Sequence, residues 1–255
     1  MKNYPYKLVV RIAQRLKRLG KTEILVLGDS HAKVLKDRTV EALFPSLYFN
    51  VVSVGGATLS GLENPNSVSQ ALPIFNYAFQ RSNSNICVVL MGEVDTGFVI
   101  WHQAKKYGQS IDQTLSKTVQ KYQAFLEKLA QSKHIICISS PLPTIVDNQD
   151  WGEVANKRRE VSASQLERTK LTLRLNSIMH SHCESMGIVY INLDAESVSE
   201  DGLVKAVLRH ENGLNHHYDP KQYLKILVPK LSEAIKQVST VERQENRGGR
   251  GNGLT

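Results

Sequence analysis

Short apolar runs alternate with longer amphipathic segments along most of the chain. Runs bounded by glycine, proline and polar residues are typical of strands that a parallel sheet buries on both faces. They predict five strands, at residues 23–27, 47–54, 85–91, 134–140 and 187–193. Helices are expected between and after them, at 32–43, 67–80 (bent or broken at Pro73), 110–131, 153–186 and 221–238.

This alternation predicts an α/β fold, a single three-layer α/β/α domain with a five-stranded, mainly parallel sheet over residues 22–239. Residues 1–21 precede it as a basic segment, and 7–19 have the spacing of an amphipathic helix. Residues 240–255 turn polar and glycine-rich, which predicts a disordered tail.

The charge is concentrated at the N-terminus. Formal net charge is +8, and residues 1–21 hold seven basic residues and no acid, so the rest of the chain is close to neutral. Two interpretations of the helix at 7–19 stay open: it packs on the edge of the domain, or it touches an anionic membrane surface or an acidic partner.

The remaining composition indicates the protein's surroundings. Cys87, Cys137 and Cys183 lie in or beside apolar stretches and cannot all pair, which fits a reducing compartment. No apolar run approaches the roughly 18–20 residues of a membrane span, and the N-terminus has no clean apolar core of a secretion signal. A cytoplasmic location is expected. One Arg-Gly-Gly-Arg-Gly copy is too little to predict a nucleic-acid partner.

Polar groups follow the predicted strands, where open α/β sheets keep their chemistry. Ser30 follows the first strand directly, at the expected start of a helix whose free N–H groups favour a developing anion. A serine nucleophile needs a base, and histidine is the usual one. His216 and His217 stand just before the last helix. They lack a further ligand at metal spacing, so no metal is expected.

The order and spacing of these groups resemble the SGNH (GDSL-like) hydrolase superfamily over residues 22–238. The resemblance rests on Gly-Asp-Ser at 28–30, the glycines at 55–56, Gly-Glu-Val-Asp at 92–95 and His-Tyr-Asp-Pro at 217–220. It implies a flavodoxin-like sheet, no cofactor, and a serine esterase or acyltransferase acting on an acyl ester.

The resemblance also implies roles for single residues. Ser30 would be the nucleophile and His217, in preference to His216, its base. The backbone N–H groups of Ser30 and Gly56 would hold the oxyanion. Asp29 belongs to the same constellation, with a structural part in the turn.

Two departures from the family pattern bear on activity. Val94 stands where the family has an asparagine that donates to the oxyanion, and losing such a donor typically costs about 10²–10³ in rate. His31 or Trp101 could donate instead, while Glu93 is an acceptor when ionised. The family's triad aspartate, three residues before the histidine, is also missing. Asn215, Asp219 or Asp95 could stand in, or Ser30 and His217 could act as a dyad.

A finer resemblance points to a substrate. The segments 92–95 and 98–101 and the double histidine are similar to bacterial SGNH-like proteins of surface-polysaccharide gene neighbourhoods, which implies an acyl group on a carbohydrate. Trp101 would stack on a sugar ring or close the core. Arg158, Arg159 and Arg168 would bind an anionic group or form a solvated helical face. The alternative function is a catalytically impaired glycan-binding or partner-binding module.

Overall fold

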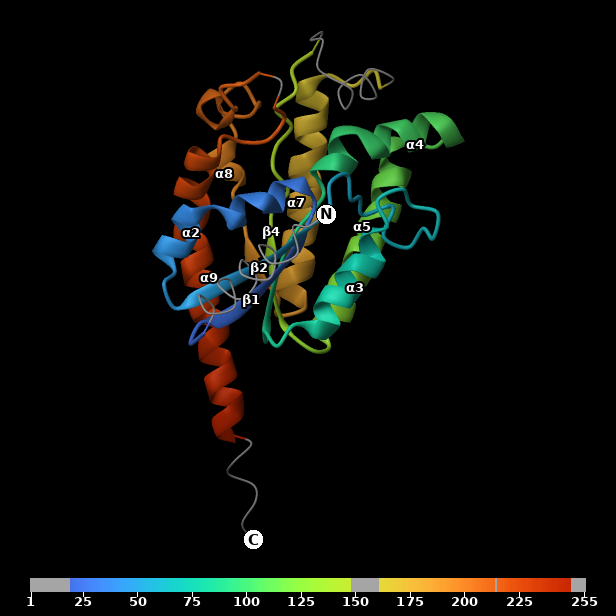
Figure 1. Ribbon diagram of the computed structural model, residues 1–255. Helices are drawn as coiled ribbons and strands as arrows, with labels where there is room; N and C mark the ends of the chain where they lie inside the picture. Colours follow the sequence, from blue (N-terminus) through green and yellow to red (C-terminus); the bar gives the residue numbers. More distant parts are fainter. Residues whose placement is uncertain (1–18, 148–160, 214, 249–255) are drawn as a thin grey trace, which may run out of the picture.

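A five-stranded sheet lies at the centre of the computed structural model, which describes residues 19–147, 161–213 and 215–248, with side chains to Val241 (Figure 1). All neighbouring strands are parallel. In the order β2-β1-β3-β4-β5 they span Leu47–Ser53, Thr22–Gly28, Ile86–Leu90, His134–Ile138 and Val189–Ile191. The predicted single α/β domain and its parallel sheet are confirmed.

Strand β1 shows why an apolar run becomes a central strand. Successive side chains of a strand point to opposite faces. Ile24 and Val26 therefore enter one hydrophobic layer, and Leu25 and Leu27 enter the other. All four side chains are fully buried.

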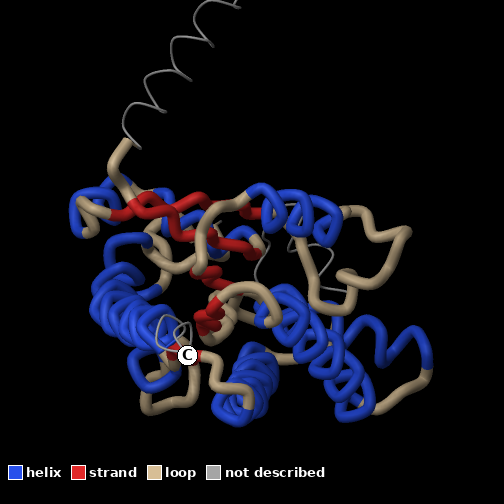
Figure 2. The backbone as a smooth tube through the Cα atoms, turned by 90° about the horizontal axis from the view of Figure 1, so that it is seen from below, coloured by secondary structure: helices blue, strands red, loops and turns tan. Residues whose placement is uncertain are grey.

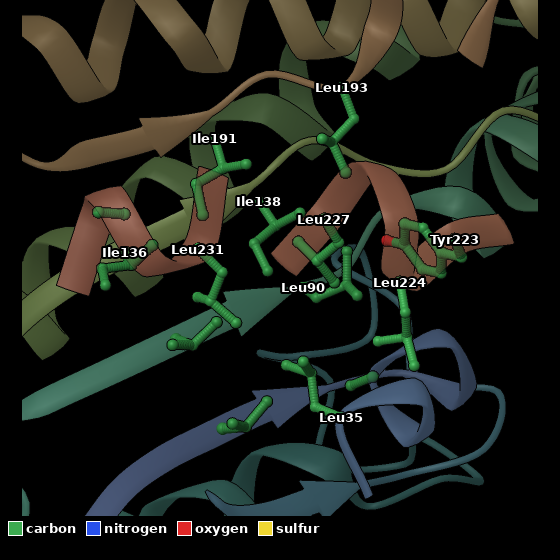
Figure 3. Packing of buried hydrophobic residues seen from close by; sticks show 14 of the residues in the cluster. Leu35, Leu90, Ile136, Ile138, Ile191, Leu193, Tyr223, Leu224, Leu227 and Leu231 are labelled. Atoms are coloured by element: carbon green, nitrogen blue, oxygen red, sulfur yellow. The ribbon is translucent and has the colours of Figure 1, made fainter. Parts of the chain in front are cut away.

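Helices cover both faces of the sheet (Figures 1 and 2). One face carries the 3-10 helix η1 (Ser30–Lys36), α2 (Arg38–Leu43) and α9 (Pro220–Gly248). The other carries α3 (Ala71–Arg81), α5 (Ile111–Ala130) and α7 (Gln165–Ser185). Figure 3 shows leucines of α9 packed over Leu90 and Ile138 of the sheet. The shorter elements are the π-helix η2 (Asp95–Val99), α4 (Ile100–Tyr107), α8 (Asp194–Ser197) and η3 (Ala206–Leu208).

The strand order reverses beside β1. The chain leaves β1 for β2 on one side and then crosses to β3 on the other. In open α/β sheets a crevice forms outside the carboxyl ends of the strands at such a point. Ser30 follows β1 there, and the N–H of Asp29 donates to Leu90 O of β3 at 3.2 Å. The topology thus places Ser30 at the mouth of the crevice.

The predicted helices at 32–43 and 67–80 differ from the structure in their continuity. The segment 32–43 divides into η1 and α2, because Asp37 is extended and its Oδ1 accepts from Thr39 N at 2.8 Å. Pro73 does not break α3. It lies in the first turn, where a proline costs the helix no internal hydrogen bond.

Two other boundaries also differ. Helix α7 begins at Gln165, after a capping box between Ser164 and Glu167. Residues 161–164, which were predicted to be helical, therefore lie outside the helix. Helix α9 continues through Gly248, into the predicted tail at 240–255, because good helix formers extend an established helix. The helical segment 95–107 was not predicted.

The predicted helix at 7–19 lies almost wholly outside the described residues, so its contact with a membrane or acidic partner stays a prediction. Across 19–147, 161–213 and 215–248, no helix combines the length and apolarity needed to cross a bilayer.

A substitution at Gly28 tests the close contact between β1 and β3. A Cβ at this position would lie 2.3 Å from Leu90 O and 2.7 Å from Ala32 Cβ. Gly28→Ala is expected to lower the free energy of unfolding by about 1–3 kcal/mol or more, because the sheet must open to admit a methyl group. Gly55→Ala is the control, since nothing lies within 4 Å of its Cβ position. Urea unfolding measures both, and equal stabilities would show that the contact is not tight.

Candidate active site

Ser30 and His217 meet at the crevice although 187 positions separate them. Ser30 Oγ lies 2.8 Å from His217 Nε2, within hydrogen-bond distance. Ser30 is the first residue of η1, and His217 stands just before α9. Both side chains are partly buried.

The turn that carries Ser30 is held by Asp29. This carboxylate is fully buried, and its Oδ1 accepts from His31 N at 2.8 Å and lies 3.1 Å from His31 Nδ1. Ser53 Oγ of β2 donates to Asp29 O at 2.6 Å. Asp29 therefore fixes the start of η1, the structural part expected of it.

The loop that carries His217 is anchored to the loop after β4. Tyr218 OH accepts from Leu142 N at 2.7 Å, and Thr144 Oγ1 donates to His216 O at 2.7 Å. An isolated antiparallel bridge joins Tyr218 to Arg209. These contacts fix the backbone on both sides of His217 and thereby position its imidazole.

Asn215 orients the imidazole. Its Oδ1 accepts from His217 N at 3.1 Å and lies 2.8 Å from His217 Nδ1. An amide oxygen only accepts, so this contact requires the tautomer with the proton on Nδ1. Nε2 then presents its lone pair to Ser30 Oγ. The amide can orient the ring, but it has no charge to offset an imidazolium.

Two acids proposed for the triad position are engaged elsewhere. Asp95 is buried and accepts from Leu59 N at 2.7 Å and from Ser60 N and Oγ at 3.1 and 3.0 Å. Asp219 Oδ1 accepts from Gln222 N at 3.0 Å at the start of α9. Neither is the partner of His217 Nδ1, which instead contacts Asn215 Oδ1; Asp95 holds the loop after β2, and Asp219 holds the start of α9.

Three histidine rings gather at Ser30. The His217 ring centroid lies 4.6 Å from that of His31 and 4.1 Å from that of His216. Burial, followed by the charges of His31 and His216, lowers the pKa of His217 to about 3, and the buried Glu93 opposes this. At neutral pH His217 is therefore an uncharged base.

The two backbone donors that the family resemblance implies for an oxyanion are not used elsewhere. Within the described part of the chain, no acceptor takes the N–H of Ser30 or of Gly56. Gly56 adopts φ +68°, a conformation that favours glycine. Val94 stands at the helical start after β3 and offers no side-chain donor.

Trp101 and Arg168 do not face the crevice as free binding groups. Trp101 Nε1 donates to Thr96 O at 2.7 Å and the ring packs on the core, in line with the core-closing alternative. Arg168 is buried and donates to Ile145 O at 2.8 Å, so its guanidinium holds the loop after β4. Its burial rules out the solvated helical face predicted as one alternative, and binding of an anionic group by Arg168 stays a prediction. Arg158 and Arg159 lie outside the described residues.

A cleft of about 350 Å³ opens beside Ser30 and His217. Its other lining residues come from η1 and its C-cap, from the histidine loop and from the start of α9; they are His31, Lys33, Val34, Lys36, Asp37, His210, Asn215, Tyr218, Pro220 and Tyr223. Over the described ranges, no three His, Cys, Asp or Glu side chains converge as metal ligands.

Comparison with known proteins identifies the fold. No family model and no curated protein matches the sequence. A GDSL-like lipase from Bacteroides thetaiotaomicron superposes with a TM-score of 0.51 at 16% identity, over 92% of this chain and 98% of that one. An acetyl xylan esterase gives 0.52 at 13% identity, over 84% and 99%. A candidate acylhydrolase from Bacteroides fragilis gives 0.52 at 17%, over 89% and 95%. The chain has the SGNH hydrolase fold. Because the identities are this low, the likeness concerns the SGNH fold alone, and the site rests on its own geometry.

The protonation state of His217 can be measured directly. NMR titration of the ring should show a pKa far below the usual value of about 6.5, because burial and the neighbouring rings disfavour the cation. Asn215→Asp should raise this pKa, since a carboxylate beside Nδ1 stabilises the imidazolium. Asn64→Asp, the same change in an exposed loop, should leave it unchanged. An unshifted His217 in Asn215→Asp would refute the contact between the two side chains.

Proposed function

We propose that the protein is a serine esterase that cleaves acyl esters with Ser30 as nucleophile and His217 as base. The observation that carries the proposal is the 2.8 Å contact between Ser30 Oγ and His217 Nε2, with Asn215 fixing the opposite nitrogen. Nucleophile, base and orienting group in this order make up the general arrangement of serine hydrolases.

The reaction follows from these contacts. Ser30 Oγ attacks the ester carbonyl carbon while His217 Nε2 takes the hydroxyl proton. The oxyanion of the tetrahedral intermediate accepts hydrogen bonds from the Ser30 and Gly56 N–H groups. Collapse breaks the ester C–O bond, and His217 returns its proton to the leaving alcohol. Water then attacks the acyl-serine, again with His217 as base, and releases the acid and free Ser30.

Two features predict a modest rate. Asn215 orients the imidazole without stabilising its charge, although the charge of the buried Glu93 favours the protonated form of His217. Val94 contributes no third oxyanion donor, a loss that typically costs about 10²–10³ in rate. The proposed enzyme is therefore slower than one with a full triad and three donors.

The finer proposal concerns the substrate. We propose an acyl group on a carbohydrate, such as a surface-polysaccharide precursor, with water or a sugar hydroxyl as acceptor. The resemblance of segments 92–95 and 98–101 supports it, and an acetyl xylan esterase shares the fold. The rival is a glycan-binding or partner-binding module, which the missing donor at Val94 favours. Saccharide binding without any Ser30-dependent turnover would select the rival.

Removing the nucleophile or the base tests the esterase directly. On short acyl esters, Ser30→Ala and His217→Ala should each lower kcat by about 10³-fold or more, because each removes one partner of the same proton transfer. The double variant should lose little more than either single one. Ser132→Ala, an exposed serine at the end of α5, is the matched control. Equal turnover in Ser30→Ala and wild type would sink the mechanism.

The pH profile tests the base. His217 is active when deprotonated, and its lowered pKa moves the loss of activity to lower pH. The value of kcat/KM, which reports the free enzyme, should therefore stay nearly constant from about pH 8 to about pH 5. Asn215→Asp should move the acid limb to higher pH. Circular dichroism at each pH controls for unfolding, and a wild-type limb at the ordinary histidine value would contradict the assignment.

A further inference from the structure

A row of side chains continues from Ser30 along one wall of the cleft. Ser30, Lys33 and Lys36 are three positions apart on η1, and all three line the cleft. In a 3-10 helix, residues i and i+3 eclipse at a rise of about 2.0 Å per residue. The three side chains therefore follow one another on one face at intervals of about 6 Å. Two ammonium groups stand in line with the proposed nucleophile.

Neither lysine has a side-chain partner among the described residues. Both are exposed, and in the described part of the chain neither forms a salt bridge or a side-chain hydrogen bond. Asp37, the acidic residue of the lining, instead accepts from Thr39 N at the start of α2. The positive charge of Lys33 reaches the site, since it contributes to the lowered pKa of His217. With two ammonium groups against the one carboxylate of Asp37, this lining keeps a net positive charge on the side of η1.

The same cleft has an unused donor. Tyr223, on α9, is only 3% exposed, yet its hydroxyl has no hydrogen-bond partner among the described residues. Buried polar atoms without a partner are rare in native structures and call for a reason. Because Tyr223 lines the cleft, a polar ligand atom that reaches it would satisfy the hydroxyl. This independent feature indicates a cleft suited to a polar ligand.

We propose that the cleft selects acyl esters that carry an anionic group, a carboxylate or a phosphate, held by Lys33 and Lys36. The inference rests on the proposed function in one respect: Ser30 marks where the ester carbonyl lies. Row geometry then places the anion about one to two 3-10 turns away, roughly 6–12 Å along η1. Lys33 and Lys36 are thus specificity-determining residues rather than part of the acyl-transfer chemistry.

Matched ester pairs test the selection. Para-carboxyphenyl acetate is compared with para-carbamoylphenyl acetate, which is neutral, and phenyl hemisuccinate with phenyl succinamate. The first pair places the anion on the alcohol side and the second on the acyl side. In at least one pair, the wild-type protein should have a higher kcat/KM for the anionic ester than for the neutral one. The double variant Lys33→Gln/Lys36→Gln should reduce the ratio of these two kcat/KM values about five- to tenfold, the effect of two exposed charge contacts. Added salt should reduce the wild-type ratio too, because it screens exposed charges.

The control removes the same charge elsewhere. Lys128→Gln/Lys236→Gln changes two exposed lysines outside the cleft lining and should keep the wild-type ratio. Lys33→Glu should lower the ratio further than Lys33→Gln, since it reverses the charge. No preference in either pair, or an equal loss in both double variants, would overturn the proposal.

Binding separates this inference from the esterase proposal. Calorimetry with para-acetamidobenzoate and para-acetamidobenzamide, and with N-phenylsuccinamate and N-phenylsuccinamide, replaces the esters by amides that a slow esterase leaves intact. Tighter binding of an anionic amide, lost in Lys33→Gln/Lys36→Gln, supports the anion site even if no ester is cleaved. Equal affinities within both pairs, alongside Ser30-dependent ester cleavage, would reject the anion site and leave the esterase standing.

Discussion

A single hydrogen bond in the candidate active site joins the segment after the first strand to the segment before the last helix. Ser30 Oγ and His217 Nε2 lie 2.8 Å apart only because two separate constraints agree. Gly28 lets β1 close on β3, so that Asp29 can start η1 at the reversal of strand order. The histidine loop is in turn fixed by Tyr218 and Thr144 to the loop after β4. Loss of either constraint would move one partner away from the other.

The electrostatics of the site favour a neutral base over a stabilised cation. Burial and two neighbouring imidazoles keep His217 uncharged, and an amide stands where serine hydrolases commonly have a carboxylate. Such a base is unprotonated at neutral pH, but its protonated form is less stabilised than that of a histidine paired with a carboxylate. The acids nearby serve the framework instead, as Asp95 shows by holding the backbone of residues 59–60. For the proposed esterase, this combination predicts a modest rate.

Much of the fold was predictable from the sequence, because central strands are apolar on both faces and their runs, such as 24–27, are unmistakable. Helix boundaries were harder, since they depend on single caps such as Asp37 and Ser164. The pairing of Ser30 with His217 was anticipated through family resemblance, and the orienting role of Asn215 was one of several alternatives. Three-dimensional information was needed to assign Arg168 and Asp95 to backbone support. It was also needed to see that a 3-10 helix aligns Lys33 and Lys36 with Ser30.

Covalent labelling tests the central claim most directly. A fluorophosphonate reacts with a serine hydroxyl only when a neighbouring base activates it. Intact-mass measurement followed by peptide mapping should find one adduct on Ser30 of the wild-type protein and a much slower adduct in His217→Ala. Absence of labelling at Ser30, or equal labelling with and without His217, would contradict the Ser30–His217 mechanism.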